Sequence, residues 1–115
     1  LEGPWLAEKF KGAHPVNLLA DPDPVVVEEL LEAGGGAVKM VTIAPERSGA
    51  LEAIKVMVAH GCVPAIGHTN ADYETTRAAI TAGARGATHL FNAMPTLKHR
   101  EPGPVLALWE DPRVD

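Results

Sequence analysis

The stretch CVPAIGHTN, residues 62–70, determines how the rest of the sequence is interpreted. Its first six residues form an apolar run of strand length, and a histidine follows directly. Two further apolar runs, VKMVTIA at 38–44 and GATHLF at 86–91, begin 24 residues before it and 24 residues after it. Because residues with helical spacing follow each run, the sequence predicts parallel strands joined by crossover helices.

Three helices are predicted around these strands, over residues 24–33, about 49–60 and about 71–82. Asp23 is a good N-cap for the first helix, and Pro24 suits its first position. Asn70 is the N-cap expected for the third helix. Gly34, Gly61 and Gly83 supply the expected stops.

The spacing of 24 residues is close to the ~30 residues per unit of an eight-stranded (β/α) barrel of ~250 residues. A doubly wound open sheet fits the same alternation. With 115 residues, the chain holds three to four βα units, which are too few to close a barrel. The predicted fold class is therefore α/β with parallel strands, and periodicity alone leaves both architectures open.

Composition narrows the class of protein. Hydrophobic residues make up 46% of the chain and charged residues 22%, as in globular proteins. The formal net charge of −5 argues against a nucleic-acid partner, and no apolar run approaches the ~20 residues of a membrane span. The single Cys62 lies in an apolar run, which predicts a buried reduced thiol in a cytoplasmic protein.

Polar side chains follow the predicted strands where ligand sites of parallel α/β folds lie, at the carboxyl ends of the strands. They are Glu2, Glu46, His68, His89 and Asn92. Two imidazoles and a carboxylate converging from different strands could form a zinc-type site. Taken singly, His68 could bond a backbone group at a helix start, and His89 could be a buried core histidine. The repetition in successive units makes a metal site a serious alternative, and the residues alone leave the structural interpretations open.

Other polar residues allow two interpretations each. Arg100, in HREPG at 99–103, could hold a phosphate or carboxylate, or could be a solvated loop residue. His14, taken alone, is a loop histidine. Glu46 could cap the helix that follows it. Trp5 and Trp109 are expected to be packing residues.

The segments LEGPW, KGAHP, VTIAPE, IGHTNADYE, GATHLFNAMP and HREPG occur in this order between residues 1 and about 108. With this order and spacing, the chain resembles the central part of the N-acetylglucosamine-6-phosphate deacetylase family, which belongs to the amidohydrolase superfamily of metal-dependent (β/α)8 barrels. The resemblance implies that residues 1–115 are the central segment of the barrel domain of a longer protein, with the barrel incomplete in this chain.

The resemblance also implies roles for individual residues. The implied metal ligands are Glu2, His68 and His89. The implied substrate-binding residues are Ala13, His14, Asn92, Ala93 and Arg100. Arg100 would bind the 6-phosphate, across a dimer interface in the family's pattern.

The implied reaction is hydrolysis of the acetamide of N-acetylglucosamine 6-phosphate, which gives glucosamine 6-phosphate and acetate. A divalent metal would activate water; zinc is expected, with iron or another divalent ion as alternatives. The catalytic aspartate is expected downstream of residue 115, so the segment alone is expected to be inactive. A homodimeric, cytoplasmic enzyme is implied, with no nucleic-acid or membrane partner. Another amidohydrolase and a non-catalytic α/β binding module remain alternatives.

Overall fold

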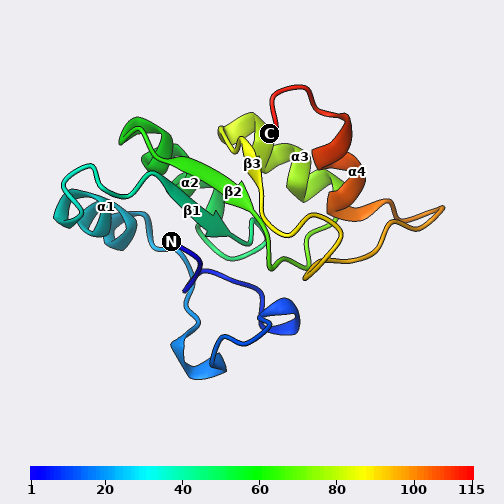
Figure 1. Ribbon diagram of the computed structural model, residues 1–115, viewed down its shortest axis with the longest axis horizontal. Coiled ribbons are helices and arrows are strands. Elements are labelled where there is room, and N and C mark those ends of the chain that lie inside the picture. Colours follow the sequence, from blue (N-terminus) through cyan, green and yellow to red (C-terminus); the bar gives the residue numbers. More distant parts are fainter.

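Three parallel strands form the central sheet of the structure, a computed structural model that describes residues 1–115. The strands are β1 (Met40–Ile43), β2 (Val63–Ile66) and β3 (Gly86–Ala87), and they lie side by side in this order. The register pairs Met40 with Val63 and Ala65 with Gly86. The predicted parallel alternation is therefore confirmed (Figure 1).

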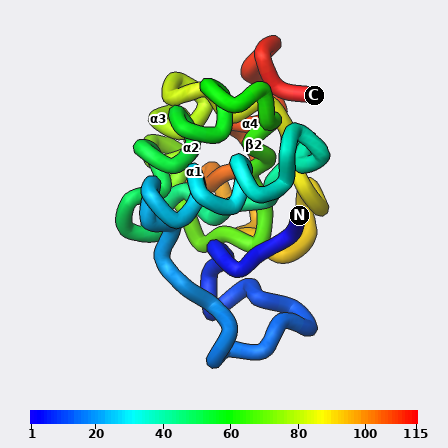
Figure 2. Tube along the Cα trace, turned by 90° about the vertical axis from the view of Figure 1, so that its left-hand side faces the viewer, coloured from blue at the N-terminus to red at the C-terminus, as the bar shows by residue number.

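Helices α1 (Pro24–Ala33), α2 (Ala50–Ala59) and α3 (Tyr73–Ala82) lie next to one another on one face of this sheet (Figures 1 and 2). A fourth helix, α4 (Gly103–Glu110), packs against α3. Two short 3-10 helices, η1 (Glu8–Phe10) and η2 (Val16–Leu18), occur in the N-terminal loop. No helix in the structure has the length and apolar character needed to cross a bilayer.

The N-caps follow the sequence prediction at one helix and depart from it at another. Asp23 caps α1, because its side chain accepts a hydrogen bond of 2.9 Å from the Val25 amide. The predicted cap of α3 at Asn70 was wrong. Asp72 is the cap and accepts from the Thr75 amide at 2.7 Å, while the Asn70 amide donates to Glu46. Nor does Glu46 cap the helix that follows it, since α2 begins after Gly49 without a side-chain cap.

The third strand is shorter than the run 86–91 that was predicted. Pairing ends at Ala87, and the backbone then enters the left-handed region at His89, Phe91 and Ala93, with φ of 54°, 73° and 52°. Non-glycine residues rarely adopt such angles, and a left-handed residue cannot continue a strand. His89 therefore lies in the loop at the carboxyl end of β3. Its side chain is half exposed and does not belong to the core.

The core lies between the sheet and its helices. Its largest fully buried side chains include Val41, Ile43, Ile54, Met57, Ile66 and Ile80. Trp5 is buried and packs into this core, as expected, and Cys62 is a buried free thiol. Trp109 was expected to be a packing residue, but it is 69% exposed and its only ring contact is edge-to-face with Phe91 at 5.6 Å.

The N-terminal residues run alongside β1 and bring Glu2 to the sheet. The Leu1 amino group donates to the Met40 carbonyl at 2.7 Å, and the Thr42 amide donates to the Leu1 carbonyl at 2.8 Å. Glu2 and Thr42 consequently form a parallel bridge. This pairing joins residues about forty positions apart in the chain, which no local pattern specifies.

A buried carboxylate joins the end of α4 to α3. Asp111 accepts hydrogen bonds from Arg113 at 2.7 and 2.8 Å and from Arg77 at 3.1 Å. The guanidinium of Arg113, followed by the charge of Arg77, outweighs the effect of burial and holds the pKa of the Asp111 carboxyl well below its usual range.

Replacing this carboxylate should have a pH-dependent effect on stability. A carboxyl with a depressed folded-state pKa stabilises the fold above its unfolded pKa of about 4, and this contribution is lost as the pH falls toward the folded value. Asp111→Asn is therefore expected to lower the thermal midpoint of the protein at neutral pH, and this deficit should shrink as the pH is lowered below about 5. Circular-dichroism melting across that range tests this. A deficit that stays constant would contradict a role for the charge.

Candidate metal centre

Three potential ligand atoms meet at the carboxyl edge of the sheet. They belong to Glu2, His68 and His89, and they all lie within 4.8 Å of one another. The Nε2 atom of His89 is 3.3 Å from Oε1 of Glu2, and Nε2 of His68 contacts the same carboxylate oxygen. These three residues are the ligand set that the family resemblance implies, and the fold brings them together.

Neighbouring strands position the three side chains. Glu2 lies beside β1 through its bridge to Thr42. His68 comes two residues after β2, and His89 comes two residues after β3. Because parallel strands end at one edge of a sheet, the residues that follow them converge there.

The backbone of the N-terminal loop holds His68 from two directions. The Ala7 amide donates to the His68 carbonyl at 2.8 Å. Nδ1 of His68 lies 2.7 Å from the Phe10 carbonyl oxygen. Since a carbonyl can only accept, Nδ1 carries the hydrogen, and this assignment leaves Nε2 with a lone pair in the neutral ring.

The backbone at Gly12 also lies close to the His68 ring. A Cβ at Gly12 would lie 3.4 Å from the His68 ring, and Gly12 has a left-handed φ of 59°. The roles of Phe10 and Gly12 were not predicted from the sequence. A backbone carbonyl carries no residue signature, and only the glycine of KGAH, at position 12, gave a local sign of an unusual backbone.

The donor set fits a divalent cation. His68 is only 6% exposed, and its Nε2 is a buried atom without a hydrogen-bond partner. This lone pair faces the Glu2 carboxylate, which is also an acceptor. Two acceptors in contact repel each other unless a cation or a proton lies between them. Two imidazole nitrogens and one carboxylate oxygen are ligands that Zn²⁺ commonly takes, with a further position open.

The neighbours of Glu2 lower the pKa of its carboxyl. Burial alone would raise the pKa of the Glu2 carboxyl, but the contacts with His68 and then with His89 outweigh burial and lower that pKa. The carboxylate is therefore ionised at neutral pH and is available as an anionic ligand.

Residues predicted to bind substrate lie beside this cluster. The ring of His14 contacts the ring of His68 edge to face, with centroids 5.4 Å apart, and its Nδ1 is 2.8 Å from the Lys11 carbonyl oxygen. Ala13 is exposed next to it. Asn92 and Ala93 follow His89, and the Ala93 carbonyl accepts a hydrogen bond of 3.1 Å from the Thr69 amide.

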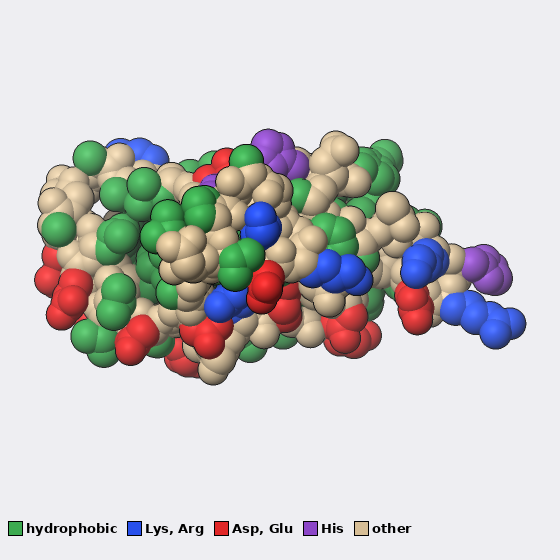
Figure 3. Space-filling view, turned by 90° about the horizontal axis from the view of Figure 1, so that it is seen from below, with side chains coloured by type: hydrophobic (Ala, Val, Ile, Leu, Met, Phe, Trp, Pro, Cys, Tyr) green, Lys and Arg blue, Asp and Glu red, His purple; other side chains and the backbone are tan.

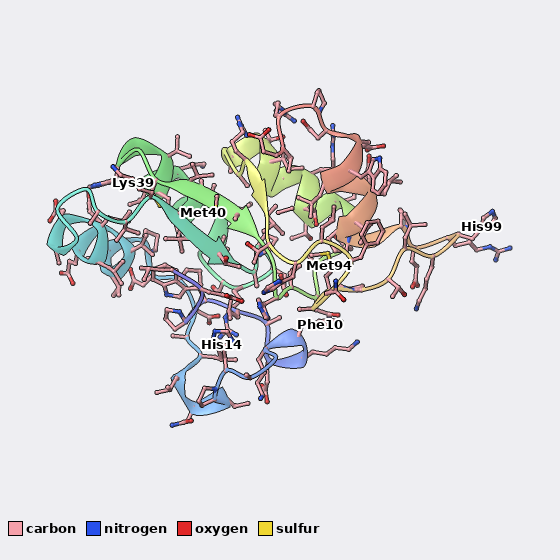
Figure 4. The ribbon with its side chains drawn as sticks, viewed as in Figure 1. Phe10, His14, Lys39, Met40, Met94 and His99 are labelled. Carbon is pink, nitrogen blue, oxygen red and sulfur yellow. The ribbon has the colours of Figure 1, made fainter.

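Arg100 does not join this cluster in its own chain. It lies on a loop whose tip is closed by mutual backbone hydrogen bonds between Lys98 and Glu101, at 3.2 and 3.3 Å. The neighbouring His99 points outward at the far end of this loop, far from His14 (Figure 4). Cationic side chains, a histidine and an acidic side chain lie at this projecting end of the surface (Figure 3).

The largest cavity lies beside this loop rather than at the histidines. It has a volume of about 510 Å³ and lies between the loop and the start of α3. Its lining includes Lys9, Lys98 and Arg100, but none of Glu2, His68 and His89. We place the candidate site at the histidines, because only there do ligand atoms converge.

No family model matches the chain, whereas curated proteins and solved structures do. The chain is 43% identical over 105 residues to N-acetylglucosamine-6-phosphate deacetylase of Vibrio furnissii. This match covers 91% of the chain and 26% of that protein. It is 39% identical over 114 residues to N-acetylgalactosamine-6-phosphate deacetylase of Escherichia coli O157:H7. This match covers 99% of the chain and 30% of that protein.

Solved structures give a closer match. N-acetyl-D-glucosamine-6-phosphate deacetylase from Mycobacterium smegmatis is 58% identical and superposes with a TM-score of 0.96, covering 98% of this chain and 30% of that chain. This likeness confirms the predicted fold class, an α/β chain that forms part of a (β/α)8 barrel. The chain spans between a quarter and a third of the length of the relatives that it matches.

Proposed function

We propose that the protein carrying this chain hydrolyses N-acetylglucosamine 6-phosphate to glucosamine 6-phosphate and acetate. The premise is that the chain, along nearly all of its length, resembles a segment of the N-acetylglucosamine-6-phosphate deacetylases. The observation that carries this proposal is the convergence of ligand atoms from Glu2, His68 and His89 within 4.8 Å. Residues 1–115 are then the central segment of a metal-dependent amidohydrolase barrel.

Glu2, His68 and His89 would hold a divalent ion, and zinc is the ion that we propose. Two imidazoles and a carboxylate suit zinc, although iron and other divalent ions also accept such ligands. The chemistry that the ion supplies in such a site is polarisation of a carbonyl oxygen and activation of water. The hydrogen bond from His68 to the Phe10 carbonyl fixes the tautomer that directs the Nε2 lone pair toward the ligand position.

The remaining roles concern the substrate, a phosphorylated amino sugar. Ala13 and His14 would contact its phosphate, and Asn92 and Ala93 would contact the sugar from the loop after β3. The contact of the His14 ring with the His68 ring, and the position of Asn92 and Ala93 directly after His89, support this assignment, in which a sugar would present its acetamide to the ligand position. The catalytic proton transfers would use an aspartate outside residues 1–115.

Arg100 would bind the 6-phosphate through its guanidinium, which matches phosphate oxygens in a bidentate manner. The neighbouring His99 lies at the outer end of the same loop, which projects from the body of the chain (Figure 4). We therefore propose that Arg100 serves the site of a second copy in a homodimer. A cytoplasmic location is proposed as well, supported by the free thiol of Cys62.

The test is acetate release by the purified full-length protein. We expect release from N-acetylglucosamine 6-phosphate, loss of activity on chelation, and recovery with Zn²⁺. The N-acetylgalactosamine 6-phosphate epimer should be assayed in parallel, because one relative is named for that substrate. Metal binding without deacetylation would indicate another amidohydrolase. If the protein takes up no metal and His68→Ala has no effect, the chain belongs to a non-catalytic binding module.

Arg100→Ala extends this test to the phosphate. Losing a charge-assisted pair should raise KM for the phosphorylated sugar roughly 10- to 100-fold, since such pairs contribute about 1.5–3 kcal/mol. The low activity on unphosphorylated N-acetylglucosamine should stay unchanged. Equal losses on both sugars would contradict the phosphate role.

A further inference from the structure

Glu46 uses both of its carboxylate oxygens on the turn that follows β2. It lies on the loop after β1, where Oε2 accepts a hydrogen bond of 2.5 Å from the Thr69 hydroxyl. Its Oε1 accepts a hydrogen bond of 2.6 Å from the Asn70 amide. Hydrogen bonds to an ionised carboxylate are the strong ones among side-chain contacts.

Thr69 carries this connection to a third loop. Its side chain is fully buried, and its hydroxyl oxygen also accepts from the Ala71 amide at 2.9 Å. Its backbone amide donates to the Ala93 carbonyl at 3.1 Å. The loops that follow β1, β2 and β3 are thus joined at one residue. That residue is the immediate neighbour of His68.

The turn at His68 requires such support. His68 has a left-handed φ of 47°, and a non-glycine residue persists there only when its surroundings hold it. Ala93, at the other end of the connection, is left-handed too, with φ of 52°. Ligand geometry tolerates only ~0.5 Å of displacement. A turn that relaxes by more than this would carry the His68 Nε2 out of alignment.

We propose that Glu46 is a positioning residue of the metal centre. It acts through Thr69 and Asn70, and it holds the His68 turn and the Ala93 carbonyl in one arrangement. This inference rests on the proposed function, because it presumes that His68 binds metal. Glu46 itself makes its hydrogen bonds only to the turn and not to a ligand side chain.

The first experiment measures Co²⁺ binding to the metal-stripped full-length protein, because the visible spectrum of Co²⁺ reports both affinity and ligand geometry. Glu46→Ala is expected to weaken Co²⁺ affinity about tenfold and to alter the spectrum, as losses of supporting contacts around ligands do. Glu46→Gln should fall between it and wild type, because its amide oxygen can still accept from Asn70 but its amide nitrogen cannot accept from Thr69. The matched control is Glu52→Ala. Glu52 is an exposed carboxylate on α2 that pairs only with Lys55.

The second experiment asks whether Glu46 acts through Thr69. Thr69→Val keeps the shape of the side chain and removes the hydroxyl. If the two residues form one connection, Glu46→Ala with Thr69→Val should weaken Co²⁺ binding much less than the product of the two single effects. Hydrogen exchange of the Asn70 amide in the metal-free protein should also accelerate in Glu46→Ala, since its acceptor is removed.

The outcomes separate this inference from the proposed function. If His89→Ala abolishes Co²⁺ binding while Glu46→Ala binds Co²⁺ with wild-type affinity and spectrum, the positioning role is overturned and the metal centre stands. If wild-type protein binds no Co²⁺, both fail. A Glu46→Ala protein that is unfolded by circular dichroism leaves the decision to Glu46→Gln, whose unchanged affinity and spectrum would likewise overturn the proposal.

Discussion

His89→Ala is expected to weaken the proposed zinc binding by at least ~100-fold and to abolish the proposed deacetylation in the full-length protein. The free energy of zinc binding to a structural site is about 10–16 kcal/mol. Divided among about four ligands, it gives a contribution of a few kcal/mol for each ligand. The side chain of His89 is 52% exposed and lies in a loop. Its removal should therefore cost metal without costing the fold. Zinc content by mass spectrometry and chelator competition measure this.

His60→Ala provides the matched control for this experiment. His60 ends α2, and its ring lies 3.5 Å from Glu28, distant in the fold from the ligand cluster. We expect unchanged zinc affinity for this variant. Full zinc occupancy and activity in His89→Ala would remove His89 from the ligand set. His68→Ala is a less clean test, because it also leaves the Phe10 carbonyl without its donor.

Gly67→Ala is expected to destabilise the protein by about 3 kcal/mol, the upper range for overpacking a core. Gly67 lies between β2 and His68, and a Cβ there would lie 2.7 Å from Cβ and 2.8 Å from the carbonyl oxygen of Thr88. These atoms belong to the backbone or are fixed to it, so no rotamer change relieves the clash. The chain segments that carry His68 and His89 must separate instead. Zinc affinity should fall together with the thermal midpoint.

Gly61→Ala distinguishes steric overlap from backbone strain. Gly61 has a left-handed φ of 69°, and a Cβ there would have no neighbour within 4 Å. We therefore expect a loss of only ~1 kcal/mol and no change in zinc affinity. Circular-dichroism melting and chelator competition compare the two variants. A Gly67→Ala protein as stable as Gly61→Ala would show that the contact between β2 and Thr88 relaxes without cost.

The predicted helices and strands were close to the observed ones where their signals were local. Residues 24–33 form α1 with the predicted cap, because an N-cap and its apolar helix lie within a few residues of each other. The alternation of strands and helices was confirmed for the same reason. The prediction of a helix cap failed where residues far apart in the chain make contact. Asn70 does not cap α3, because the helix begins only at Tyr73 with Asp72 as its cap, and the Asn70 amide instead donates to Glu46, 24 residues earlier in the chain.

The candidate site was predictable in residue type but not in geometry. One histidine directly follows the second apolar run and another lies within the third. In the structure each comes two residues after its strand, and parallel strands deliver both to one edge. The sequence could not show that Glu2 pairs with β1, or that the Phe10 carbonyl, 58 residues away, binds His68. Backbone carbonyls and amides are present at nearly every residue, so their partners leave no mark on composition or spacing.

The sequence by itself determined that this protein has parallel βα units and polar residues at the strand ends, because hydrophobic periodicity and capping act over a few residues. Only the tertiary structure decided the geometry in which the histidines at the strand ends meet a carboxylate. His68 and His89 meet at Glu2, while His60 and His99 lie elsewhere. The physical reason is that the left-handed turns after β2 and β3, and the loops that hold them, set the directions of the side chains. Those turns are stabilised by hydrogen bonds between segments far apart in the chain.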